Sequence, residues 1–229
     1  MTCITKRVKN LFFPAKCVRC RRPMPSDSEA FCEKCLASWQ AAYALRRTTG
    51  IHAPQGTDAV VCLASYHKGN PTGAVEKLIY HVKHKGSRQV MEFVVSCLAE
   101  ELTVEGDAPV VTYPPRRRVA VIRDGFDQAS RLARGLAKYV GGEYQTLFRR
   151  AYFGDHEQKR LDTGDRKRNA DAAFLPTRHF DERVKGRTVI LVDDLTTTGA
   201  TLGTCTALLR RAGATHVIWA TIAQNEMES

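Results

Sequence analysis

The chain has 229 residues, enough to bury one full domain and a small appendage. Its formal net charge of +11 favours polyanionic partners such as phosphate, pyrophosphate or nucleic acid, but it does not locate a site for them. Apolar runs are too short to span a bilayer and the N-terminus lacks a signal-peptide pattern, so the sequence predicts a cytoplasmic protein without membrane insertion.

Two C-x2-C pairs lie close together near the N-terminus, Cys17 with Cys20 and Cys32 with Cys35. Cysteines in a cytosolic protein are more often metal ligands than disulfides. Four thiolates at this spacing predict a closed, structural Zn²⁺ site with no open position for catalysis, although chance spacing is an alternative. Other cysteines lie in apolar contexts and are expected in the core: Cys62, Cys97 and Cys205.

A helix over 31–47 would complete a zinc-knuckle module at 1–47, and the glycines and proline of 48–58 predict a linker. The third part, 59–229, alternates strands with helices. Strands are predicted at 59–66, 109–112, 143–147, 189–192 and 216–222, and helices at 72–85, 88–102, 127–140 and 202–212. This alternation predicts an α/β fold with a parallel sheet that helices cover on both faces.

The most informative segment is VILVDDLTTTGATL at 189–202. Its apolar β-branched run is typical of a strand buried on both faces, and two carboxylates, Asp193 and Asp194, are expected where the strand ends. A small, hydroxyl-rich turn then leads into a helix: Thr196, Thr197, Thr198, Gly199, Ala200 and Thr201. Such a turn offers N–H groups to a phosphate, and carboxylates accept hydrogen bonds from sugar hydroxyls. The alternative is a buried strand, an Asp-Asp turn and a Thr N-cap.

A ligand with a pyrophosphate group also needs cations or N–H donors opposite this turn. Three arginines at 116–118 follow a predicted strand, and 123–128 forms a turn into a helix. The polar, basic stretch 158–169 is a candidate mobile flap that would exclude water. Exposed basic loops and ordinary helix capping by Asp127 are the alternatives.

The 189–202 segment resembles the signature of type I phosphoribosyltransferases, which bind phosphoribosyl pyrophosphate (PRPP). In that family the acidic pair holds the ribose hydroxyls and the loop wraps the 5′-phosphate, which implies catalytic or orienting roles for Asp193 and Asp194. The order of motifs is similar to the ComF family: the cysteine pairs, LIYHVKHKG, RDGFDQASRLA, QKRL with RKRNADAAF, and VILVDDLTTTGATL.

Membership of the ComF family would imply a type I phosphoribosyltransferase fold with an N-terminal zinc module, Mg²⁺ bound with PRPP, and a role in natural competence. It would also imply contacts with single-stranded DNA and a competence helicase. The resemblance adds five residues near the PRPP site: Arg123, Gln128, Gln158, Arg168 and Asn169.

Two departures from the family pattern concern the pyrophosphate side. The Pro-Val-Pro segment is replaced by Val111-Thr112-Tyr113-Pro114-Pro115, and an arginine is replaced by Asp124, whose charge is expected to weaken pyrophosphate binding.

Two functions follow as alternatives: a PRPP-binding, phosphoribosyltransferase-like protein in DNA uptake, or a non-catalytic basic zinc adaptor that binds single-stranded DNA and competence partners. The sequence does not identify an acceptor, a general base or an oligomeric state.

Overall fold

A computed structural model describes residues 15–24, 30–45, 56–66, 73–104, 106–151 and 173–225. Its main elements, in chain order, are α2 (Glu33–Leu45), β1 (Ala59–Tyr66), α3 (Ala74–His84), α4 (Arg88–Glu101), β2 (Val110–Thr112), α5 (Arg118–Asp124), α6 (Gln128–Tyr139), β3 (Glu143–Tyr144), β4 (Phe148–Arg150), β5 (Phe174–Pro176), α8 (Phe180–Val184), β6 (Thr188–Thr196), α9 (Ala200–Arg211) and β7 (His216–Asn225).

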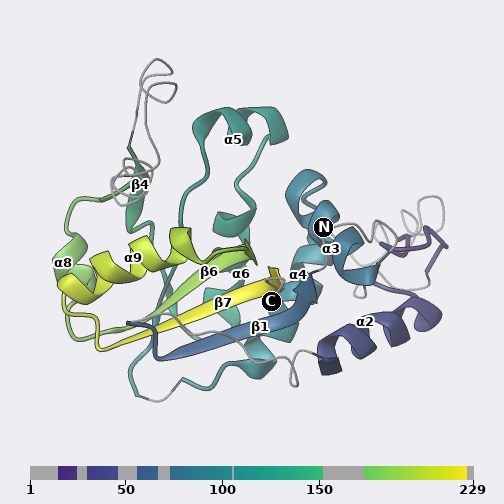
Figure 1. The fold of residues 1–229 in the computed structure, drawn as a ribbon, viewed down its shortest axis with the longest axis horizontal. Helices are drawn as coiled ribbons and strands as arrows, with labels where there is room; N and C mark the ends of the chain where they lie inside the picture. Colours follow the sequence, from purple (N-terminus) through teal and green to yellow (C-terminus); the bar gives the residue numbers. More distant parts are fainter. Residues whose placement is uncertain are drawn as a thin grey trace, which may run out of the picture.

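The central sheet has the strand order β1-β7-β6-β2-β3, and each neighbouring pair is parallel (Figure 1). Strand β6 lies in the middle, between β7 and β2, and its four apolar residues from Val189 to Val192 are fully buried. Burial on both faces explains why this stretch is apolar without alternation. The predicted parallel α/β sheet is therefore confirmed.

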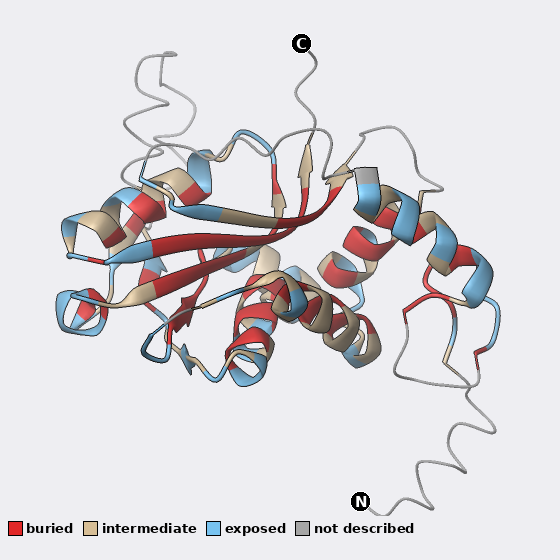
Figure 2. Cartoon of the chain, turned by 90° about the horizontal axis from the view of Figure 1, so that it is seen from below, coloured by how far each residue is buried: buried red, intermediate tan, exposed pale blue. Residues whose placement is uncertain are grey.

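The two faces of the sheet carry different helices, and side chains of β6 alternate between them. Ile190 and Val192 pack in one apolar cluster with α3, α4 and α6, whereas Val189 and Leu191 pack in another with α8 and α9. Figure 2 shows the buried strands between these layers. Successive side chains of a strand point to opposite faces, so this alternation also decides where the next residues of β6 point.

The N-terminal cysteine-rich segment packs directly on the same core. Phe31 and Trp39 contact the Phe93 ring of α4 edge-on, with ring centroids 5.6 and 5.7 Å apart. Both are almost fully buried, in the same cluster as Leu63 of β1. The segment is thus joined to the larger part by aromatic packing. Because 46–55 lies outside the described residues, the division at 1–47, 48–58 and 59–229 stays a prediction.

Several elements differ from the prediction. Strand β6 continues to Thr196, so the acidic pair lies within the strand instead of after it, and α9 begins at Ala200. Helix α5, the β4–β5 hairpin and α8 were not predicted; α5 has no buried residue and therefore no apolar periodicity to detect. No helix in the described parts of the chain is long and apolar enough to cross a bilayer.

Candidate functional site

The acidic pair of β6 is divided between the two faces of the sheet. Asp193 follows the alternation of Val189 and Leu191, and lies on the face of α9; Asp194 follows Ile190 and Val192, and lies on the face of α3 and α6. The two carboxylates therefore meet different surroundings although they are neighbours in sequence.

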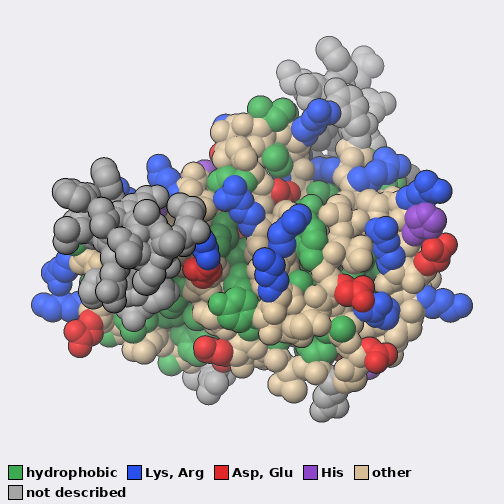
Figure 3. All heavy atoms as spheres, turned by 180° about the vertical axis from the view of Figure 1, so that it is seen from behind, with side chains coloured by type: hydrophobic (Ala, Val, Ile, Leu, Met, Phe, Trp, Pro, Cys, Tyr) green, Lys and Arg blue, Asp and Glu red, His purple; other side chains and the backbone are tan. Residues whose placement is uncertain are grey.

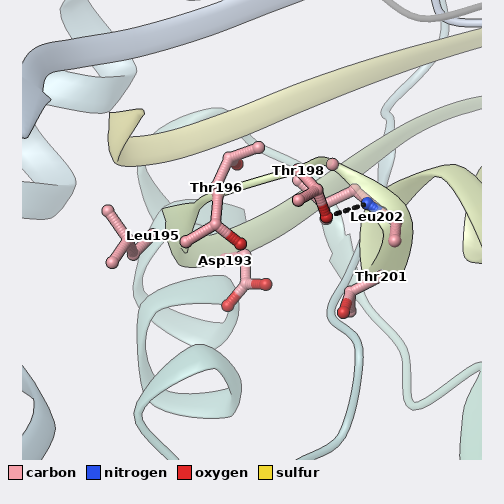
Figure 4. Close-up of a pocket in the computed structure, with 9 residues that line it drawn as sticks. Asp193, Leu195, Thr196, Thr198, Thr201 and Leu202 are labelled. Carbon is pink, nitrogen blue, oxygen red and sulfur yellow. Dashed lines mark hydrogen bonds between the residues drawn. The ribbon is translucent and has the colours of Figure 1, made fainter. Parts of the chain in front are cut away.

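Asp193 lines a small hollow together with the loop that leads into α9 (Figure 4). The hollow holds about 240 Å³ of space, part of it open to solvent, and its walls are Asp193 and residues 195–202. One carboxylate oxygen of Asp193 accepts a hydrogen bond from the backbone N–H of Asp194 at 2.8 Å. Burial, followed by the charge of Asp194, raises the pKa of Asp193 well above its usual range. A positive charge or hydrogen-bond donors from a ligand would stabilise the ionised form of this carboxylate.

The loop after β6 has the features of a phosphate site. Thr197, Thr198, Ala200 and Thr201 are exposed around the hollow. The N-cap of α9 is Gly199, which has no side chain to cap the helix, so no N-cap side chain competes with a ligand for the amides of this twelve-residue helix. The Thr198 hydroxyl accepts from the Ala200 N–H at 3.4 Å and braces the turn. The buried Thr196 hydroxyl has no hydrogen-bond partner among the described residues.

The backbone conformation at residue 199 explains why glycine occupies this position. Its φ is +71°, in the left-handed region that favours glycine. A Cβ there would lie 3.4 Å from two ring carbons of Trp219, whose indole N–H donates to the Thr206 hydroxyl of α9 at 2.8 Å. The loop therefore rests on a fixed aromatic ring.

Asp194 is 5% exposed, and its carboxylate contacts residues on the other face of the sheet, where α3 and α6 pack. The side-chain amide of Gln128, at the start of α6, donates to Asp194 Oδ2 at 2.7 Å. The ammonium of Lys83, near the end of α3, lies 3.9 Å from Asp194 Oδ1. Gln128 is itself 4% exposed, and its Oε1 has no partner among the described residues. The sequence resemblance placed Gln128 near the PRPP site; Lys83 was not among the predicted residues, since a cation also suits the end of a helix.

The loop between β2 and α6 is organised around Asp124. Its carboxylate accepts from Arg116 Nη2 at 2.9 Å and from Arg123 Nε at 3.0 Å, and His84 Nδ1 lies 3.7 Å away. Arg123 first, and then Arg116, hold the pKa of Asp124 well below its usual range. Two guanidinium groups therefore offset the negative charge of Asp124 in this loop, and its expected effect on pyrophosphate binding stays a prediction.

Asp127 also stabilises this loop. Its carboxylate caps α6 by accepting from the Ser130 N–H at 3.2 Å, and it accepts from the Arg116 N–H at 3.0 Å. The capping alternative for Asp127 is thus correct. Three predicted residues, Gln158, Arg168 and Asn169, lie outside the described residues, so their placement at the site stays a prediction.

The four cysteines of the N-terminal segment lie together. All four sulfur atoms, of Cys17, Cys20, Cys32 and Cys35, are within 4.8 Å of one another. A tetrahedron of sulfurs around zinc, with bonds of about 2.3 Å, has edges of about 3.8 Å. Burial favours the neutral thiol of Cys17, but backbone hydrogen bonds at Cys20, Cys32 and Arg19 outweigh it and lower the pKa to about 6. Burial raises the pKa of Cys35 to about 12, so Cys17 and not Cys35 is shifted toward the thiolate form that binds metal. The closeness of the four sulfur atoms is what shows that the cluster can hold a metal ion, and four thiols suit zinc.

Comparison with known proteins agrees with the fold. Residues 119–228 match the phosphoribosyl transferase domain. Two curated relatives, both named DNA utilization protein YhgH, come from Salmonella typhi and Salmonella typhimurium; they are 26% and 25% identical, and each alignment covers 91% of this chain and 97% of the relative.

Solved structures similar to the chain include the glutamine PRPP amidotransferase from B. subtilis, with 22% identity and a TM-score of 0.41. The match covers 65% of this chain and only 27% of that enzyme. A hypoxanthine phosphoribosyltransferase from Staphylococcus aureus has 13% identity and a TM-score of 0.33, with coverage of 67% and 70%.

The parallel sheet, the acidic pair and the matched domain define an α/β protein with a type I phosphoribosyltransferase fold. The alignments with the curated relatives cover 91% of this chain, and four clustered sulfurs lie in its N-terminal segment. The matched domain and the curated relatives, together with the cysteine cluster near the N-terminus, support the similarity to the ComF family that the order of motifs indicated.

Proposed function

We propose that the chain binds PRPP with Mg²⁺ at the β6–α9 loop and acts as a phosphoribosyltransferase-like protein in DNA uptake. The observation that carries the proposal is that Asp193 and the N-terminus of α9 line the same hollow. One wall offers a carboxylate to sugar hydroxyls, and the other offers amides and hydroxyls to a phosphate. A pentose 5-phosphate carries both groups.

The residues suggest a division of tasks in binding. Thr197, Thr198 and Thr201, with the first amides of α9, would hold the 5′-phosphate. Asp193 would accept hydrogen bonds from the ribose, and the buried Thr196 hydroxyl would gain a partner. Mg²⁺ suits carboxylate and phosphate oxygens, and when bound it would neutralise the diphosphate charge. In a transfer reaction these groups would act by orientation and electrostatic stabilisation, because the described site shows no general base.

A titration with PRPP and Mg²⁺, followed by thermal unfolding, tests the binding. A ligand present at 100 times its Kd stabilises the folded state by about 2.7 kcal/mol, which is about 5–11 °C for a chain of this size. Asp193→Asn, alone and together with Asp194→Asn, should abolish the shift. Asp181→Asn, the same change on the exposed first turn of α8, is the matched control and should keep it. An unchanged shift in the double variant would refute the site.

A second candidate, a non-catalytic adaptor for single-stranded DNA, is favoured by the net charge of +11. Lysine and arginine side chains are spread over the face in Figure 3 and do not form a single stripe. This candidate predicts a salt-dependent affinity for single-stranded DNA that survives the Asp193 and Asp194 substitutions. The relatives' name, DNA utilization protein, is consistent with either candidate, and a competence helicase is a proposed partner in both.

A further inference from the structure

We propose that Lys83, on α3 and outside the matched phosphoribosyl transferase domain, binds the diphosphate end of PRPP. This proposal rests on the proposed function and extends it to the other side of the sheet. The domain match begins at residue 119, so it assigns no role to α3.

The position of Lys83 is the first argument. Helix α3 packs against β6, and the Lys83 ammonium reaches Asp194 Oδ1 at 3.9 Å. That distance is too long for a hydrogen bond, and the ammonium makes no hydrogen bond to any described residue. Its side chain is 30% exposed, so it lies between the buried carboxylate and solvent. Its three N–H donors are therefore available to a ligand.

The engagement of other cations is the second argument. Arg116 and Arg123, predicted for the pyrophosphate side, both donate to Asp124. Arg123 is 66% exposed, and the Arg116 side chain is bound into the loop by that ion pair. Lys83, in contrast, is directed at the acidic pair itself. Lys83 thus places a cation beside the pair that would hold the ribose.

The unpartnered oxygen of Gln128 is an independent observation. This side chain is 4% exposed, it donates to Asp194 at 2.7 Å, and its Oε1 accepts nothing from the described residues. A buried acceptor without a partner costs about 1–3 kcal/mol. A hydroxyl of a ligand beside Asp194 would satisfy it. A ligand that contacts both the Asp194 face of the sheet and the hollow beside Asp193 would explain why this buried oxygen is left without a partner.

The two faces together match a ligand with two anionic ends. Asp193 and the α9 loop form the 5′-phosphate side, and Asp194, Gln128 and Lys83 form the opposite side. Ligands of open α/β sheets bind across the carboxyl ends of the strands, where these groups lie. The ribose would lie across the end of β6, and the Lys83 ammonium on the Asp194 face would neutralise part of the diphosphate charge.

Binding of three magnesium-containing probes to the full-length, metal-loaded protein tests the role of Lys83: PRPP, inorganic pyrophosphate and ribose 5-phosphate. Lys83→Met should weaken the binding of PRPP and of pyrophosphate by about tenfold or more, equivalent to about 1.4 kcal/mol. The affinity for ribose 5-phosphate should stay within about twofold of the wild-type value. Lys83→Arg should retain most of the PRPP affinity because it keeps the charge. Lys85→Met, at the exposed C-cap of α3, is the matched control and should bind all three probes normally.

Each result has a defined meaning. Unchanged PRPP affinity in Lys83→Met would overturn the proposal. An equal loss for PRPP and ribose 5-phosphate would also overturn it, because Lys83 would then act only by holding Asp194. If the wild type binds neither PRPP nor ribose 5-phosphate, the proposed function itself fails and this role falls with it. Lys83→Gln, compared by its ligand-free melting temperature, separates a folding defect from a binding defect.

Discussion

The substitution Gly199→Ala tests whether the shape of the β6–α9 loop is what binds phosphate. At φ +71° an alanine lies in the left-handed region, which costs about 1–2 kcal/mol for a residue with a Cβ. The new Cβ would lie 3.4 Å from the Trp219 ring, an ordinary contact, so sterics add little. The expected loss of stability is therefore about 1–2 kcal/mol, or about 2–8 °C in melting temperature.

The effect on binding should be larger than the effect on folding. To relieve the strain the loop must rotate Gly199, which turns the first amides of α9 away from the phosphate position. We expect at least a tenfold loss of PRPP affinity, measured by calorimetric titration. Gly141→Ala is the matched control, because its φ is +64° and a Cβ there meets nothing within 4 Å. It should lose similar stability and no affinity. Equal PRPP affinity in the two variants would refute the reasoning.

The remaining predictions concern pH and metal. Because the pKa of Asp193 is raised in the folded chain, PRPP binding should decline on acidification at a higher pH than for an ordinary carboxyl; a pH titration that shows no such shift contradicts this. For the same reason the free protein loses stability as pH rises from the unfolded to the folded pKa, so Asp193→Asn should raise the melting temperature at neutral pH while abolishing binding. Metal analysis should find one zinc per chain, lost in Cys17→Ser and kept in Cys97→Ser. Chelation should lower the melting temperature of the entire chain, because Phe31 and Trp39 share a core with Phe93; a separate, lower transition would contradict that coupling.

Local patterns determined the parts of the fold that local physics controls. The Val189–Val192 run must be buried on both faces, and it is the centre of the sheet. The spacing of the cysteines placed four sulfurs within one cluster, because a C-x2-C turn brings two thiols together by itself. The amphipathic helices α3, α4 and α6 also followed from their periodicity.

Other elements have no such local signal. Helix α5 buries no residue, and the two-stranded β4–β5 hairpin joins segments that are far apart in sequence. Periodicity records only which side of an element is apolar, and it does not record which distant element covers that side. The prediction therefore failed where an element is either exposed or completed by a remote partner.

The same distinction applies to the site. The sequence by itself determined that two carboxylates directly precede a small, hydroxyl-rich turn, because these residues are consecutive in the chain. Only the tertiary structure decided that Asp193 faces that turn while Asp194 faces Gln128 and Lys83, 66 and 111 residues away in the chain. It also decided that Asp124 is neutralised by arginines. Strand alternation separates neighbouring side chains, but the packing of helices on each face determines what those side chains contact.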